Sequence, residues 1–429
     1  MRNLVLVLLS IAVMTCGNEV PETDSFVLDN GLKVTLAKMP SEEVFIGLYA
    51  KEGYASLPKE KVVSGRIADH IAWNSGIGDK NTDQIAYLLY NKNIEFSAEI
   101  YSLHRAMQGR CPKGETKQVF ELMRTLFAEP RFSKEAFDQE VARRKKKLLN
   151  QPPTWSKTLD RAFLLMNTNN FYPYETISFE NLQTADFETS RDFYRKAFSN
   201  PREFHLIIVG EIDPEAMREQ LQDTLATLAP TSDTFTSPTL PPFPTNHPIQ
   251  SVPIQNRTSS TMRLAFPVNE IFDCKSYRKL LTLSHLVETH LKRMIAENNI
   301  PIHGLSANLE LPYYPHVANA WITLQFQGDF ETLNNHISTL VKEMQAVTDA
   351  PISADELAAL EDSLDKTYTR WQTPQEYWFT TLSNAALFGW GWQQLAQPPP
   401  KSLSPDTIHH LYKDLLQLDR YSVIATKPE

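Results

Sequence analysis

The segment "VLDNGLKVTLAKMP" (residues 27–40) has the pattern of an opening β-strand followed by a turn. A tight D-N-G turn precedes "LKVTLAKM", in which apolar and polar residues alternate with the period of a strand. A comparable run, "TMRLAFPV", begins at Thr261. Two later β-rich runs, "EFHLIIVGEID" from Glu203 and "RYSVIATKP" from Arg420, lie far downstream of the first two. The sequence therefore predicts two parts, each of which begins and ends in a strand.

Helical patterns lie between these strands. In "KQVFELMRTLF", Val119, Leu122, Met123, Leu126 and Phe127 follow the spacing of a buried helical stripe. The order strand, helices, strand occurs twice, which predicts an α+β fold made by tandem duplication of one unit.

Residues 229–253 are rich in proline, serine and threonine and show no periodicity, so they read as a linker. We therefore expect an N-terminal half at 25–228, a linker at 229–253 and a C-terminal half at 254–429.

Composition excludes several classes of function. The formal net charge is −9, which argues against a nucleic-acid partner. There are 14 glycines against 28 prolines, and no G-x-G-x-x-G or Walker-type run that would cradle a phosphate. The single basic run, "RRKKK" at 143–147, reads as the solvated face of a helix.

The first 16 residues resemble an export signal. Arg2 precedes an apolar run from Leu4 to Val13 that is too short to span a bilayer, and Cys16 follows it as in a bacterial lipobox. We favour lipidation of Cys16 over simple cleavage, with residues 17–24 as a tether. The protein is then expected in the periplasm or at the outer membrane, held there by a lipid anchor only. The sequence leaves open whether Cys111 and Cys274 pair.

Five further stretches extend the pattern of residues 27–40 into a family resemblance. Together they resemble, in order, the insulinase/pitrilysin-like (inverzincin) metallopeptidases, which implies a clamshell of two homologous α/β halves. The stretches are "EGYASLPKEKVVSGRIADH" (52–70), "LFAEPRFSKEAFDQE" (126–140), residues 171–213, "LKRMIAENNIPIHGLSA" (291–307) and "ISADELAALEDSL" (352–364).

The resemblance also indicates a degenerate zinc site. Active members carry H-x-x-E-H, in which two histidines on one helical face bind zinc and the glutamate serves as general base, and a distal glutamate completes the ligand set. Here the motif reads R-x-x-D-H, with Arg66, Asp69 and His70, and the distal position falls at Lys147. Glu140, seven residues before Lys147 and therefore on the same helical face, is retained. We expect a charge cluster in which Asp69 or Glu140 pairs with Arg66 or Lys147.

A second signature of active members is degenerate as well. The arginine and tyrosine that contact substrate in the second half correspond here to Ala296 and His303. "HLVETH" (285–290) is no replacement for the zinc motif, because histidines five residues apart on a helix diverge by about 140°.

The resemblance implies a non-catalytic subunit without a zinc cofactor, as in two-subunit processing peptidases of this family. Such a subunit would bind unstructured peptides or pair with an active homologue. Two alternatives stay open: an active enzyme with an atypical metal set built on His70, Glu140 and Asp69, and a scaffold of an envelope complex.

Overall fold

The computed structural model describes residues 20–150, 154–245, 249–254, 258–268, 273–349, 374–396 and 404–428, with a few single positions between 353 and 362. The export signal expected at 1–16, with Cys16, and the first residues of the tether lie outside the described residues. Within the described part of the chain, no helix is long and apolar enough to cross a membrane.

The first half is built on a six-stranded sheet in the order β1-β2-β6-β3-β5-β4. The opening strand β2 pairs in parallel with the closing strand β6, and the other neighbours are antiparallel. β4 lies at one edge of the sheet. The strands are β1 (Glu22–Val27), β2 (Lys33–Lys38), β3 (Glu43–Lys51), β4 (Glu95–Ile100), β5 (His104–Pro112) and β6 (His205–Gly210).

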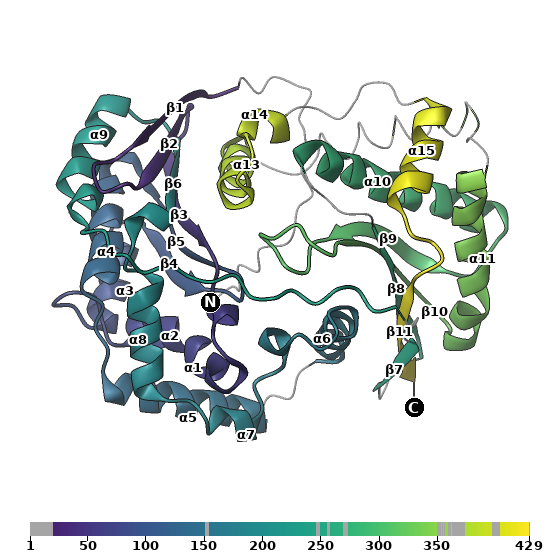
Figure 1. Cartoon of the computed structure of the whole chain (residues 1–429), viewed down its shortest axis with the longest axis horizontal. Helices are drawn as coiled ribbons and strands as arrows, with labels where there is room; N and C mark the ends of the chain where they lie inside the picture. The colour runs from purple at the N-terminus through teal and green to yellow at the C-terminus, as the bar shows by residue number, and fades with distance from the viewer. Residues whose placement is uncertain are drawn as a thin grey trace.

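Helices of the first half cover one face of this sheet (Figure 1). The stripe predicted in "KQVFELMRTLF" is confirmed, because all five of its apolar residues are buried in α4. The helices are α1 (Val62–Gly65), α2 (Ala68–Asn74), α3 (Thr82–Asn91), α4 (Thr116–Ala128), α5 (Lys134–Asn150), α6 (Trp155–Asn167), α7 (Phe179–Leu182), α8 (Phe187–Ala197) and α9 (Pro214–Asp223).

The second half repeats this topology. Its sheet has the order β7-β11-β8-β10-β9, in which β7 and β11 are parallel and all other pairs antiparallel, as in β2-β6-β3-β5-β4. The duplication inferred from element order is therefore present in the strand pairing. The elements are β7 (Ile249–Ile254), β8 (Ser260–Pro267), α10 (Cys274–Glu297), β9 (His303–Glu310), β10 (Trp321–Gly328), α11 (Phe330–Asp349), α13 (Pro374–Phe388), α14 (Trp392–Leu395), α15 (Pro405–Leu415) and β11 (Ser422–Pro428).

One strand differs from the sequence-based expectation. "TMRLAFPV" forms β8, whose counterpart by pairing is β3, so it does not open the second half. The opening strand is β7, which lies mostly within residues 229–253. β7 is an edge strand with largely exposed side chains and a proline at 253. An edge strand has a neighbouring strand on one side only. Its apolar and polar residues therefore need not alternate strictly, and not every backbone N–H has to donate to another strand.

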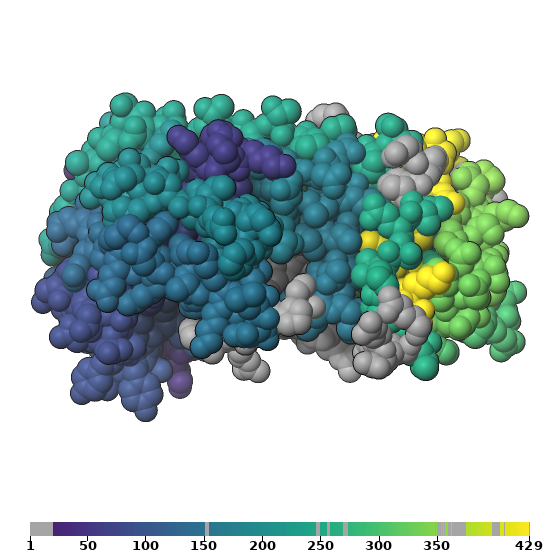
Figure 2. Space-filling view, turned by 90° about the horizontal axis from the view of Figure 1, so that it is seen from below, coloured from purple at the N-terminus to yellow at the C-terminus, as the bar shows by residue number. Residues whose placement is uncertain are grey.

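The two halves exchange a helix. α6 belongs to the first half by sequence, yet Leu159 and Phe163 pack on Trp321 and Ile424 of the second sheet. In the opposite direction, Trp378 of α13 packs on the first sheet, in a cluster with strand residues of β2, β3, β5 and β6. Seen from below, α6 fills the space between the halves (Figure 2). Each sheet therefore has one face covered by helices of its own half and the other by a helix of the opposite half.

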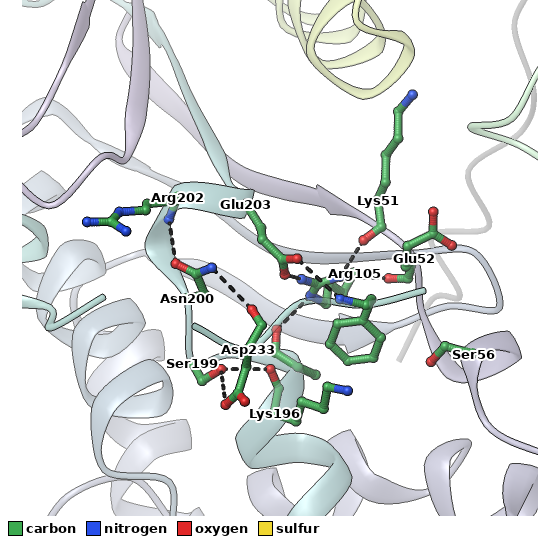
Figure 3. Close-up of polar contacts among 12 residues, drawn as sticks. Lys51, Glu52, Ser56, Arg105, Lys196, Ser199, Asn200, Arg202, Glu203 and Asp233 are labelled. Carbon is green, nitrogen blue, oxygen red and sulfur yellow. Dashed lines mark hydrogen bonds and ion pairs between the residues drawn. The ribbon is translucent and has the colours of Figure 1, made fainter. Parts of the chain in front are cut away.

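The segment between the halves is fixed to the first half by a buried arginine. Arg105 is fully buried, forms an ion pair with Glu203, and donates hydrogen bonds to the carbonyl oxygens of Lys51, Glu52 and Ala197 (Figure 3). Burial lowers the pKa of Arg105 to about 10, so the group remains a cation. The Phe235 ring lies 4.4 Å from the guanidinium carbon, in cation–π geometry.

Further contacts join the same segment to both halves. Asn200 Nδ2 donates to the Asp233 carbonyl at 3.1 Å (Figure 3). Ser237 Oγ donates to Glu52 Oε1 at 2.6 Å. The Pro241 carbonyl then accepts from Tyr313 Oη at 2.9 Å and from Asn319 Nδ2 at 3.0 Å, both in the second half. Cys111 and Cys274 are both free, buried thiols in different halves.

Candidate functional site

The R-x-x-D-H motif lies where α1 ends and α2 begins. Arg66 is the residue after the last turn of α1, and Asp69 and His70 lie in the first turn of α2. The helix is interrupted at Arg66 and Ile67. The His70 N–H donates to Asp69 Oδ1 at 2.7 Å, and the Arg66 carbonyl accepts from Arg144 Nη2 at 3.4 Å. Positions 66 and 70 therefore do not lie one turn apart on one continuous helix.

Arg66 is half-buried and points its guanidinium at backbone oxygen. Its Nη1 donates to the carbonyl of Glu175 at 2.6 Å, and its Cζ lies 5.6 Å from the centre of the Tyr54 ring. Burial lowers the pKa of Arg66, and the nearby guanidinium groups of Arg161 and Arg144 lower it further, while Tyr54 and Glu175 raise it. The group remains a cation and has no lone pair for a metal.

Both carboxylate oxygens of Asp69 accept hydrogen bonds from backbone N–H groups. Its Oδ1 accepts from His70, and its Oδ2 accepts from the N–H of Ile100, the last residue of β4, at 3.0 Å. The single carboxylate of the motif thus joins α2 to the edge strand. His70 itself is exposed on the surface of α2.

Glu140 is the most buried member of the group, with a fully buried side chain in α5. The prediction that Glu140 pairs with Arg66 or Lys147 is wrong. Glu140 pairs with Arg143 at 2.7 Å and with Arg144 at 2.5 Å, one turn onward on the same helix. Burial alone would raise the pKa of Glu140, but these two cations, with a contribution from His70, hold its pKa below the usual value. The influence of His70 indicates that His70 and Glu140 lie near each other. Lys147 is exposed in the last turn of α5.

These residues do not fit a zinc ion. Arg66 replaces one donor, both oxygens of Asp69 accept from backbone N–H groups, and both oxygens of Glu140 accept from arginines. Zinc needs deprotonated donors with free lone pairs that converge on one point. Among the described residues, no group of three or more histidine, cysteine, aspartate or glutamate side chains could hold a metal.

The two positions that correspond to the substrate-contacting arginine and tyrosine of active members lie on different elements. Ala296 is exposed near the end of α10, and His303 is exposed at the start of β9. In "HLVETH", Glu288 pairs with Lys292 and accepts from the N–H of Ala307 at 3.0 Å, so it has a structural role. Burial lowers the pKa of both His285 and His290.

Sequence reasoning missed the arginines around the motif. Arg143 and Arg144 stand three and four residues after Glu140, the spacing at which helical side chains meet, so this pair was readable from the sequence. Arg161 carries no such signal. It reaches the region from α6, and its Nη1 donates to the carbonyl of Tyr174, next to the carbonyl that Arg66 uses.

Comparisons with known proteins agree with this architecture. Residues 184–364 match the family model described as the Peptidase M16 inactive domain. Protein YhjJ of Salmonella typhimurium is 25% identical over 187 residues, which are 42% of this chain and 36% of that protein. The match therefore spans about a third of the length of this curated relative.

Solved structures of M16 proteins have the same fold. The periplasmic protease PqqL from Escherichia coli superposes with a TM-score of 0.75 at 14% identity, over 96% of this chain and 47% of PqqL. The peptidase M16 inactive domain from Pseudomonas fluorescens gives a TM-score of 0.77 at 12% identity, over 95% of this chain and 98% of that protein. This chain thus has the insulinase-like fold of the M16 peptidases and resembles their inactive members.

Proposed function

We propose that this chain is a non-catalytic, insulinase-like subunit of the bacterial cell envelope that binds unstructured peptides and pairs with an active zinc-peptidase homologue. One observation carries the non-catalytic part. The guanidinium of Arg66 occupies a ligand position of the family motif, and both oxygens of Asp69 accept hydrogen bonds from backbone N–H groups. Since a guanidinium offers no lone pair to a metal and the Asp69 carboxylate is already engaged, these motif residues do not supply the ligand set and general base that metal-assisted hydrolysis needs.

Peptide binding is supported by the edge strand next to the motif. The N–H of Tyr101 donates to the carbonyl of His104, so residues 101 and 104 face each other through hydrogen bonds. By the antiparallel alternation, the backbone groups of Ile100, Ala98 and Phe96 point away from β5, toward the free edge. Asp69 uses the N–H of Ile100. The groups of Ala98 and Phe96 are placed to pair with an added strand.

Pairing is supported by the fold match to PqqL and by the family resemblance. This chain aligns with 47% of PqqL, about half of it. Family resemblance implies four halves around one chamber, and the described chain supplies two. A partner that carries an intact H-x-x-E-H would contribute the zinc chemistry, and this chain would contribute binding surface.

The export signal expected at 1–16 and the likeness to a periplasmic protease support a place in the periplasm or at the outer membrane, with Cys16 as the lipid-modified residue. Release of the protein from membranes by Cys16→Ser would support the anchor, and unchanged membrane association would contradict it.

The function is tested by assaying this chain, a candidate M16 partner and their 1:1 mixture against a library of unstructured peptides. We expect no cleavage by this chain alone, peptide binding by this chain, and faster cleavage by the mixture than by the partner. EDTA-sensitive cleavage by this chain alone would overturn the non-catalytic role. A mixture no faster than the partner, with no complex on gel filtration, would overturn the pairing.

The edge strand gives a matched pair of variants. Ala98→Pro removes one outward N–H without removing a bond to β5, so it should weaken peptide binding while the fold persists. Ala98→Ser keeps the N–H and is expected to bind as the wild type does. Equal binding by both variants would exclude β4 as the binding edge.

A further inference from the structure

We propose that the degenerate metal position binds a carboxylate of the bound peptide, held by the guanidinium groups of Arg66 and Arg161. This inference rests on the proposed peptide binding and names the class of peptide. A site that holds a dication in active relatives would here hold an anion.

The two arginines donate to consecutive backbone carbonyls, and Arg161 is near enough to Arg66 to lower its pKa. Arg66 donates to the carbonyl of Glu175, and Arg161 donates to the carbonyl of Tyr174, the preceding residue. Arg66 comes from the junction of α1 and α2, and Arg161 comes from α6, the helix that lies between the halves (Figure 1). Each uses one N–H for this contact, and a guanidinium has five, so donors remain for a ligand.

The carboxylates around them already have partners. Glu140 pairs with Arg143 and Arg144, and Glu175 pairs with Lys59 at 2.8 Å. Asp69 accepts from two backbone N–H groups. Among the described residues, neither Arg66 nor Arg161 has a carboxylate within ion-pair distance. Within the described part of the chain, the two arginines therefore carry cationic charge that no carboxylate pairs at contact distance.

The surroundings favour a strong interaction with an anion. Both arginines are half-buried, and the Tyr54 ring lies against Arg66. Partial burial reduces solvent screening, and a guanidinium matches a carboxylate with two parallel hydrogen bonds. The neighbouring His70 is exposed, so the motif region is open to solvent on at least one side. A peptide on the edge of β4, which Asp69 joins to the motif helix, would pass close to this pair.

The carboxylate has two sources, an acidic side chain or the C-terminus of the peptide. The test uses four fluorescent unstructured peptides of one sequence, with either glutamate or glutamine at the centre and either a free or an amidated C-terminus. Binding to the whole chain is measured by anisotropy at low and moderate salt. We expect the peptide that supplies the recognised carboxylate to bind about tenfold more tightly than its neutral counterpart.

The double substitution Arg66→Gln with Arg161→Gln should abolish this preference and leave the affinity for the neutral peptide unchanged. The matched control, Lys342→Gln with Lys413→Gln, removes the same charge from α11 and α15 of the second half and should keep the preference. If the double variant fails to fold by circular dichroism, Arg66→Lys serves instead. It keeps the charge but loses the two-bond geometry, and should reduce the preference severalfold.

The outcomes separate the two proposals. A preference for either the central glutamate or the free C-terminus, lost in the arginine variant, supports the carboxylate site and identifies the source. Equal binding of all four peptides overturns the carboxylate site and leaves peptide binding intact. A preference that survives the arginine variant also overturns it. If none of the four peptides binds and no peptide of the library binds, the proposed peptide binding is overturned as well.

Discussion

The Oδ2 atom of Asp69 lies 3.0 Å from the backbone nitrogen of Ile100 and accepts its hydrogen bond. In active relatives, the corresponding acidic residue acts on the zinc-bound water. In this chain the carboxylate joins a helix to the end of an edge strand. By the resemblance, the acidic residue type is nearly kept, and the contact that it makes in this chain is a structural one.

Removal of this acceptor should destabilise the fold. Asp69→Ala leaves the N–H groups of Ile100 and His70 without their carboxylate, which costs about 1–3 kcal/mol for a partly buried donor. Asp69→Asn keeps one oxygen acceptor and should lose less. Chemical denaturation at pH 7 measures both. Equal midpoints for wild type and Asp69→Ala would show that the contact contributes nothing.

The buried Glu140 should contribute more than Asp69. Glu140→Gln leaves Arg143 and Arg144 without their counter-charge and should lower the free energy of unfolding by about 3 kcal/mol at pH 7. Glu135→Gln, an exposed change on the same helix, is the control.

The effect of Glu140 should also depend on pH. Because the pKa of Glu140 is lowered in the fold, its contribution is complete above the pKa of the unfolded chain, near 4.3, and is lost as pH falls through the folded value. The gap between wild type and Glu140→Gln should therefore close in acid. A gap that stays constant from pH 7 to pH 3 would contradict the ion pairs.

His104 should make the whole fold sensitive to mild acid. Burial lowers its pKa to about 3, and its ring stacks on Tyr101 at 4.3 Å and meets Tyr314 of the second half edge-on at 5.3 Å. Below pH 6.5 the unfolded chain takes up a proton that the folded chain does not. At pH 5 this loss amounts to about 2 kcal/mol relative to pH 7.

Other buried histidines act in the same direction, so the contribution of His104 needs its own variant. His104→Phe keeps a flat ring and removes the titrating group, and its loss between pH 7 and pH 5 should be about 2 kcal/mol smaller than that of the wild type. Parallel pH profiles for the two proteins would show that His104 is not the cause.

The zinc content of the purified protein should not depend on His70, the one histidine of the R-x-x-D-H motif. We expect the purified chain and His70→Ala to carry equal trace zinc after dialysis, measured by elemental analysis. His303→Ala, a change at another exposed histidine, is the control. One zinc per chain in the wild type, lost in His70→Ala and kept in His303→Ala, would restore the alternative of an atypical metal enzyme.

Periodicity predicted the elements that bury a full apolar stripe or face. β2, β6, β8, β11 and α4 belong to this class, and their side chains have to alternate or recur because they pack on a core. β7 escaped prediction because an edge strand with exposed side chains has no such constraint. The exchange of α6 and α13 escaped as well, since an apolar helical face looks the same whichever sheet it covers.

The sequence pointed to the positions of the candidate site but not to the contacts that these residues make. Motif spacing located Arg66, Asp69 and His70, but it assumed one unbroken helix, whereas the chain turns at Arg66 and Ile67. The partners of Glu140 were sought seven residues away at Lys147. They lie three and four residues away, because side chains one helical turn apart meet directly.

The reciprocal packing of α6 and α13 determines what can fold independently. A fragment cut between the halves would carry α6 away from Trp321 and leave that indole, and the sheet face around it, open to water. The opposite fragment would take Trp378 away from the first sheet. We therefore expect that neither piece folds alone, because each carries a helix that covers a sheet face of the other. The two pieces would have to assemble by fragment complementation, so a break in the connecting segment would create an obligate pair of fragments.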